Sequence, residues 1–198
     1  MTTKYQLEEI RSQILLDLIS AYPTKFSGYE DSSCRGEAVF GTPSPHPNSV
    51  LDLLVQCKVA FALPFAYYRV CVAGDPASLD TSTDGVALSP ETLKTALRGQ
   101  VRLKEGEMQF ATKLAFQQCT AWKCAGKSRA EVYAWIIPDV AVTNGILERG
   151  EFTGSGFCGG CMQVFPQELK KAKKKVWKDL PPYFDLPPWD DAAYQFGS

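Results

Sequence analysis

The sequence predicts an all-α fold, an irregular helical domain within residues 1–190, and three observations support this prediction. Apolar side chains recur every three or four positions in several segments, which is the spacing of a helix with one buried face. Serine, proline and glycine stand where such helices should begin and end. No segment shows the sustained alternation of a strand, and we find no repeat of fixed period.

The composition is that of an ordinary globular protein. Of 198 residues, 45 % are hydrophobic and 22 % are charged, and the net charge of −1 gives no reason to expect a polyanionic partner. The first residues lack the basic and apolar regions of a signal peptide, and no apolar run reaches the roughly 18 residues of a membrane span. We therefore expect an intracellular protein, cytoplasmic or nuclear, with no membrane partner.

The first helix is expected between Tyr5 and Pro23, because a proline ends a helix at or before the preceding residue. Serine, glycine and proline in residues 24–48 predict a loop after it. The apolar positions of this first helix are Leu7, Ile10, Ile14, Leu15, Leu18 and Ile19.

Two further helices complete the N-terminal part, residues 1–74. One has Asn48 or Ser49 as its N-cap, and the next begins at Pro64 and ends near Gly74. A polar loop follows over residues 75–88. The side chains expected to pack inward from these two helices are Val50, Leu53, Leu54, Cys57, Phe61, Tyr67, Tyr68, Val70 and Cys71.

The C-terminal half, residues 89–190, is expected to begin with a long helix. Ser89 and the proline after it are typical of a helix start, and the helix could run to Cys119 with a break at Gly99 or Gly106. A capping box at residues 128–131 predicts another helix, which must stop near Pro138.

A last helix is predicted to start at Pro166. The prolines of residues 181–188 should then prevent helix formation and produce an extended C-terminal strap, which packs Phe184, Leu186 and Trp189 on the body. Residues 191–198 are expected to be a tail. The buried positions of the last helix are expected to be Leu169, Ala172, Val176 and Leu180.

Two pairs of cysteines predict a structural zinc site. Cys119 and Cys124 form one pair, and Cys158 and Cys161, separated by two glycines, form the other. Four thiolates in two close pairs are typical of a tetrahedral Zn²⁺ site, which leaves no open position for catalysis. Two disulfides, or four small buried side chains, are the alternatives, and the odd count of seven cysteines weakens the disulfide alternative.

Catalytic motifs are not evident, and we do not expect an enzyme. The single histidine, His46, lies between prolines in a segment predicted to be a mobile loop, which is a poor position for a general base. Neither a phosphate-binding loop nor the histidine–glutamate motif of zinc deaminases is present. The least implausible reactive thiol is Cys34.

A run of lysines provides an alternative function. Non-specific nucleic-acid binding depends on lysine contacts to phosphates, so a basic helix over residues 170–175 could serve a nucleic-acid-binding module. A solvated helix face is the more ordinary interpretation, because the run has no arginine and the net charge is slightly negative. The lysines are Lys170, Lys171, Lys173, Lys174 and Lys175.

The order of several segments resembles a known family. Together with the two cysteine pairs, they resemble the BACK-like region that follows the BTB/POZ domain in a large group of fungal, mostly basidiomycete, proteins. The segments are Lys4-Tyr-Gln-Leu-Glu-Glu-Ile-Arg, Ala21-Tyr-Pro-Thr, Leu63-Pro-Phe-Ala-Tyr-Tyr, Leu88-Ser-Pro-Glu-Thr-Leu and Trp177-Lys-Asp-Leu-Pro-Pro-Tyr-Phe-Asp-Leu-Pro-Pro-Trp189.

This resemblance implies a non-enzymatic scaffold, the protein–protein interaction domain of a BTB-type adaptor. Ubiquitin-ligase or transcriptional partners are expected by analogy with the family. The BTB domain itself would precede Lys4 and is not part of this chain, so cullin recruitment and BTB dimerisation are not expected of this segment. An exposed apolar or aromatic patch around Tyr67, Tyr68 or Trp189 would be the expected contact surface.

Overall fold

The computed structural model describes residues 2–30, 46–73, 87–116, 146–148 and 158–191. These residues form α-helices and short 3₁₀ turns, and no strand occurs among them, as the all-α prediction requires. The α-helices are α1 (Thr2–Ala21), α2 (Phe26–Glu30), α4 (Pro47–Gln56), α5 (Leu63–Ala73), α6 (Pro90–Phe116) and α8 (Gly159–Tyr183). The 3₁₀ turns are η2 (Ala60–Ala62) and η4 (Ile146–Glu148).

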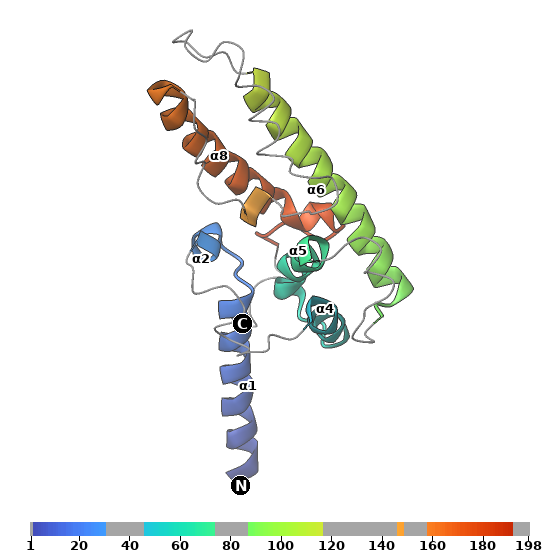
Figure 1. Cartoon of the computed structure of the whole chain (residues 1–198). Helices are drawn as coiled ribbons and strands as arrows, with labels where there is room; N and C mark the ends of the chain where they lie inside the picture. Colours follow the sequence, from blue (N-terminus) through green and yellow to red (C-terminus); the bar gives the residue numbers. More distant parts are fainter. Residues whose placement is uncertain (1, 31–45, 74–86, 117–145, 149–157, 192–198) are drawn as a thin grey trace.

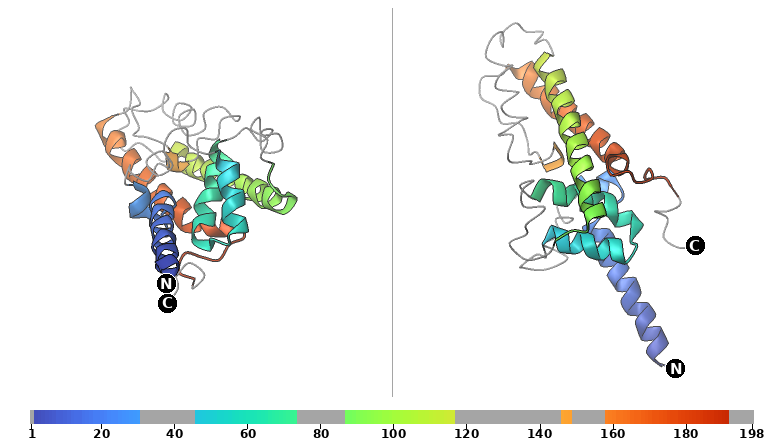
Figure 2. Two further views of the ribbon diagram at one scale, coloured as in Figure 1. Left: turned by 90° about the horizontal axis from the view of Figure 1, so that it is seen from below. Right: turned by 90° about the vertical axis from the view of Figure 1, so that its right-hand side faces the viewer.

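Helix α5 lies at the centre of the molecule and packs against α4, α6 and α8. The two longest of the body helices, α6 and α8, run in opposite directions and diverge towards one end (Figure 1). Helix α1 projects away from this body, so that only its C-terminal end lies close to the other elements (Figure 2). The core is therefore built mainly from α4, α5, α6 and α8, and the end of α1, η2 and η4 also contribute to it.

The predicted faces of α5 are confirmed and those of α4 are partly wrong. Tyr68 and its inward neighbours on α5 are buried, whereas Leu53 and Cys57 on α4 are exposed. The face of α4 that packs on α5 instead includes Leu51, which is fully buried. Several apolar residues stand in series on this helix, and only the packing against α5 determines which of them face inward.

Part of the segment predicted to be a loop is helical. Helix α2 lies within it, and α4 begins at Pro47 with His46 as its N-cap, two residues before the first of the predicted caps. The backbone N–H of Asn48 donates a hydrogen bond to Nδ1 of His46 at 3.2 Å. The imidazole thus satisfies one of the unpaired amides that begin a helix, a task normally performed by serine or aspartate.

Helix α6 is continuous through both of its glycines. Ser89 caps it as predicted, since its Oγ accepts a hydrogen bond from the Thr92 N–H at 3.2 Å. Gly99 is required by a close approach, because a Cβ at this position would lie 2.0 Å from Cε1 of Phe184. The Phe184 ring is buried between Gly99 and Tyr67, whose ring centroid lies 5.0 Å away.

Helix α8 is longer at both ends than predicted. It begins at Gly159 rather than Pro166, and it includes Pro181 and Pro182 in its last turn. Proline has no N–H, so Pro181 leaves the Trp177 carbonyl without its helical donor. The indole Nε1 of Trp189 donates to this carbonyl at 2.7 Å, which compensates for the missing bond and explains why the helix tolerates the proline.

Trp177 is the centre of an aromatic cluster that joins distant parts of the chain. Its ring lies 5.2 Å from that of Tyr29 on α2, 5.6 Å from that of Phe65 on α5, and 5.5 Å from the stacked ring of Trp189. Such pairs contribute roughly 0.5–1.5 kcal/mol each beyond the area that they bury. The predicted inward positions of α8 are also confirmed, with Ala172 only partly buried.

We predict that Gly99→Ala destabilises the protein, although alanine normally favours a helix interior by about 1 kcal/mol. The new methyl group would overlap the enclosed Phe184 ring, and such overpacking costs about 1–3 kcal/mol. The free energy of unfolding, measured by urea denaturation, tests this.

Gly106→Ala is the matched control on the same helix. Its Cβ would lie 3.2 Å from the Tyr183 hydroxyl, at the end of a side chain that can shift slightly. We expect it to equal or exceed the wild type in stability. A Gly99→Ala variant as stable as Gly106→Ala would contradict the packing of Phe184 described here.

Candidate functional site

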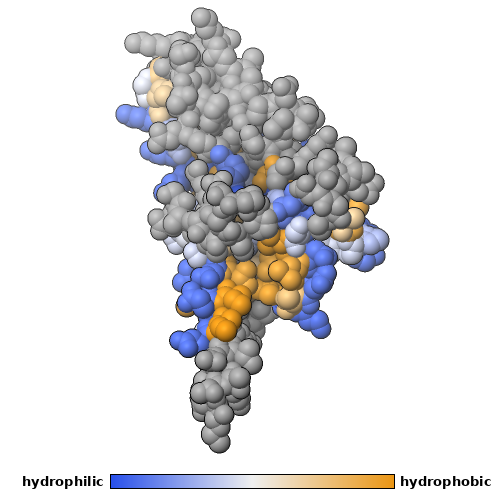
Figure 3. All heavy atoms as spheres, turned by 60° about the horizontal axis from the view of Figure 1, so that its bottom comes forward, coloured by the Kyte–Doolittle hydropathy of each residue, from blue (hydrophilic) through white to orange (hydrophobic). Residues whose placement is uncertain are grey.

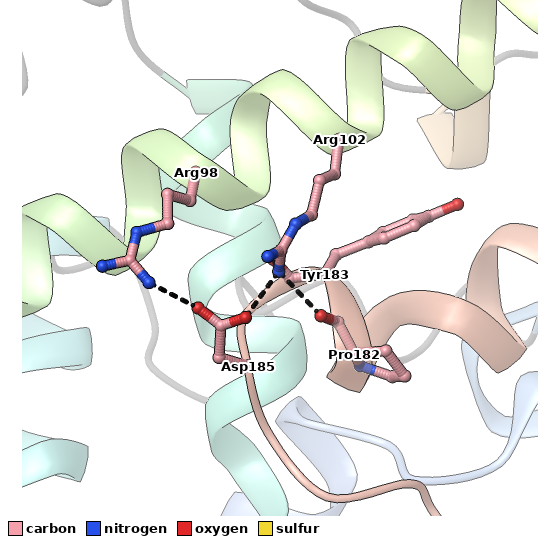
Figure 4. A network of polar contacts seen from close by, with 5 residues as sticks. All are labelled: Arg98, Arg102, Pro182, Tyr183 and Asp185. Carbon is pink, nitrogen blue, oxygen red and sulfur yellow. Dashed lines mark hydrogen bonds and ion pairs between the residues drawn. The ribbon is translucent and has the colours of Figure 1, made fainter.

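A polar clamp fixes the C-terminal end of α8 to α6 (Figure 4). Arg98 donates to one carboxylate oxygen of Asp185 at 2.8 Å, and Arg102 donates to the other at 2.7 Å. Arg102 also donates to the carbonyls of Pro182 and Tyr183, at 2.9 and 2.8 Å. One guanidinium thereby satisfies two carbonyls at a helix end that have no intrahelical partner.

Asp185 occupies a backbone position that usually favours glycine. Its φ of 56° is left-handed, and the N–H groups of Asp185 and Leu186 return to the carbonyls of Pro182 and Pro181 at 3.2 and 3.0 Å. This is the Schellman ending of a helix. A carboxylate replaces the common glycine here, and that carboxylate is the group that binds both arginines of α6.

A cavity of about 290 Å³ lies between α6 and α8, beyond the clamp. Its apolar wall includes Phe110, Ile146 and Val176, and the hydroxyl-bearing Tyr183 ring also lines it. Burial raises the pKa of Tyr183, so its hydroxyl stays protonated at neutral pH. The charged residues that line the cavity are Lys113 from α6 and Glu168, Lys171 and Lys175 from α8.

Glu168 joins the two helices at this cavity. Its carboxylate accepts hydrogen bonds from Lys171 at 2.7 Å and from Lys113 at 3.1 Å. The bond from Lys171, and then that from Lys113, lowers the pKa of Glu168 below its usual value. Lys175 forms no ion pair within the described ranges, so positive charge exceeds negative charge at the cavity.

The lysines of residues 170–175 do not share one face. Lys170 pairs with Glu30 of α2 at 3.1 Å, whereas Lys171 and Lys175, one turn apart, line the cavity. Lys174 is exposed and Lys173 is half-buried. Of the five lysines proposed for nucleic acid, two therefore face the cavity and one pairs with a carboxylate of another helix.

The second predicted cysteine pair lies at the start of α8. Cys158 is the N-cap residue, with extended backbone, and Cys161 follows in the first turn, both at intermediate exposure. Cys119 and Cys124 lie outside the described residues. Among the described residues, which include only two of the four predicted cysteines, no three potential metal ligands come together.

The other candidate reactive groups have ordinary positions. His46 is a helix cap, and Cys34 lies outside the described residues. Cys71 is buried as predicted, and burial raises the pKa of its thiol to about 12. The Cys71 Sγ lies 3.3 Å from the Ala96 carbonyl, to which it donates, so this thiol is a packing element between α5 and α6.

Of the residues expected to form the contact surface, Tyr67 and Tyr68 are buried in the core and Trp189 is half-buried. The projecting helix α1 instead has exposed apolar residues, which were not part of the expected contact surface. Ile10, Ile14 and Leu16 are 56 %, 53 % and 60 % exposed. Figure 3 shows a cluster of hydrophobic residues on the face of the molecule drawn in that view. The helical pattern of α1 was recognisable, but the exposure of Ile10 and Ile14 among the described residues was not.

Comparison of the chain with protein-family models, with curated protein sequences and with solved structures finds no significant match. None of the helices in the described part of the chain is long and apolar enough to cross a lipid bilayer.

We predict that Lys171→Met raises the pKa of Glu168 more than Lys113→Met does, because Lys171 makes the shorter hydrogen bond. NMR titration of the Glu168 carboxyl carbon measures both shifts. Lys170→Met is the control, since Lys170 pairs with Glu30 instead.

The same pKa shift determines a pH dependence. The folded pKa of Glu168 lies below the unfolded one, so these ion pairs stabilise the fold above the unfolded pKa, and the contribution is lost as the pH falls through the folded value. A Glu168 pKa that is identical in wild type and Lys171→Met would contradict this arrangement.

Proposed function

We propose that this chain is a non-enzymatic protein–protein interaction domain and that α1 is its contact element. The observation that carries the proposal is the exposure of Ile10, Ile14 and Leu16 on a helix that projects from the body. Ile10 and Ile14 lie one turn apart on the same face, which is the arrangement of anchor residues in helices that bind an apolar groove.

The energetics favour such a role. Most helical stability in proteins comes from packing of an apolar face, and in the part of the chain that the structure describes Ile10, Ile14 and Leu16 of α1 remain more than half exposed. Burial of an exposed isoleucine contributes roughly 1.5–3 kcal/mol, so a groove that receives both Ile10 and Ile14 gains several kilocalories per mole. A partner protein would bury the apolar face of α1, as the body buries the apolar faces of the other helices.

The similarity to the region that follows BTB/POZ domains supports a narrower form of this proposal. In that form the domain belongs to an adaptor, and its partners are components of ubiquitin ligases or transcriptional complexes. The exposed face of α1 is consistent with either class of partner.

We further propose that Cys119, Cys124, Cys158 and Cys161 bind one structural Zn²⁺. Support comes from the topology: α6 ends at Phe116, three residues before Cys119, and α8 begins directly after Cys158. These helix ends lie at the same end of the pair (Figure 1). Three residues of chain reach at most about 11 Å, which keeps Cys119 near the end of α6.

The position of the second pair also suits a metal. Cys158 and Cys161 are three residues apart at a helix N-terminus, where the helix dipole favours the thiolate form that binds zinc. Zn²⁺ bound by four thiolates would join α6 to α8 opposite the Asp185 clamp. It would contribute about 10 kcal/mol of apparent folding free energy. Four thiolates would leave no open coordination position on the metal for catalysis.

We predict that the double variant Ile10→Ser/Ile14→Ser loses at least tenfold of the partner protein that co-purifies with the wild-type chain. The loss follows from removing two anchor side chains from the contact. Quantitative mass spectrometry of affinity-purified complexes measures it, and sedimentation shows whether the partner is a second copy of the chain.

Leu53→Ser/Val101→Ser is the matched control, because these side chains are 58 % and 57 % exposed on the body. Both double variants should keep the unfolding free energy within about 1 kcal/mol of wild type, since their side chains are already exposed. Equal retention of the partner by the α1 variant and the wild type would refute the contact role of α1.

We predict one Zn²⁺ per chain in protein purified without chelator, and its loss in Cys158→Ser together with cooperative unfolding. Elemental analysis measures the metal. Cys57→Ser, an exposed cysteine on the body, should keep the zinc. Cobalt-substituted wild-type protein should show the absorption of four-thiolate coordination, a readout that does not depend on how the variant folds. Metal-free wild-type protein would exclude the site.

A further inference from the structure

The cavity between α6 and α8 combines two chemical properties. Its wall includes the apolar side chains of Phe110, Ile146 and Val176. Among the described residues that line it, three lysines stand against one glutamate, which gives these residues a net charge of +2. At about 290 Å³, the cavity is at the lower end of the range of small-molecule sites.

The lysines come from two helices and converge on this cavity. Lys171 and Lys175 stand one turn apart on α8, where like charges destabilise a helix by a few tenths of a kcal/mol. Lys113 reaches across from α6 to the same carboxylate that Lys171 binds. Glu168 compensates one of these charges, and Lys175 keeps its ammonium group without an ion-pair partner among the described residues.

From this combination we propose that the α6–α8 cavity binds a small phosphate monoester that carries an apolar group. The phosphate, with a charge of about −1.5 to −2 at neutral pH, matches the excess positive charge. Lys175 and Lys171 would contact its oxygens, and the protonated Tyr183 hydroxyl can donate a further hydrogen bond. The apolar group would lie against Phe110 and Val176.

The size of the cavity favours a small molecule over a nucleic acid. A polyanion gains affinity from many cations along an extended surface. Here the lysines of α8 point in several directions, and those that face the cavity share it with an apolar wall that a phosphate backbone cannot use. The ligand class is therefore an amphipathic anion.

The test uses 1-naphthyl phosphate as the probe, titrated into the full chain in a calorimeter at low salt. We expect saturable binding of one molecule per chain, and about tenfold weaker binding by Lys175→Met. Lys174→Met is the matched control, because Lys174 is exposed on the same helix but does not line the cavity. This control should bind as the wild type does, and both variants should keep the wild-type Tm.

Two fragments of the probe separate its contributions. Inorganic phosphate lacks the apolar group and 1-naphthol lacks the charge, so each should bind at least tenfold more weakly than the ester. The proposal is overturned if the ester does not bind, if Lys175→Met binds it as tightly as Lys174→Met, or if inorganic phosphate binds as well as the ester. The proposal is also overturned if duplex DNA displaces the probe and if Lys175→Met and Lys174→Met weaken the binding of DNA equally.

The same head group occurs in lipids and in soluble esters. Vesicles of phosphatidylcholine with and without phosphatidic acid distinguish these sources. Co-sedimentation that requires phosphatidic acid and is lost in Lys175→Met identifies a lipid ligand. Binding of the soluble ester without co-sedimentation identifies a soluble one, and either result supports the proposed chemistry independently of the contact role of α1.

Discussion

The packing of aromatic rings around Trp177 is the constraint on which the rest of the structure depends. This one side chain is in contact with α2, α5 and the chain that follows α8. Its carbonyl, which lacks a helical donor because of Pro181, receives the indole N–H of Trp189. The same residue thus holds the helix against the core through its ring and holds the C-terminal segment through its backbone.

This anchoring determines where the charged face of α8 lies. With Trp177 and Leu180 directed into the core, Lys171 and Lys175 are left at the border with α6. The Phe184 ring beneath Gly99 and the carboxylate of Asp185 then fix the rotation of α8 about its own axis. The cavity and its excess of positive charge are therefore consequences of core packing.

The sequence predicts correctly those features of the fold that depend on residues close together in the chain. The Ser89 cap and the buried positions of α8 follow from local spacing, and the structure confirms them. Features that depend on distant residues were missed or wrong. The Trp189 indole, which compensates for Pro181, is twelve residues from its acceptor, and Lys113 is 55 residues from Glu168. No periodicity indicates such pairs, nor the exposure of Ile10 and Ile14 of α1 among the described residues.

The clamp between Asp185 and the arginines of α6 holds α6 and α8 together at one end, so the angle between the helices at the clamp sets their separation at the other end. About 21 Å of α6 extends from Arg102 to Phe116, so a rotation of 5° at the clamp moves the far end by about 2 Å. Such a displacement is comparable to the difference between a closed and an open hydrogen bond. The angle at the clamp therefore determines the distance between the ends of α6 and α8 that the proposed Zn²⁺ would join.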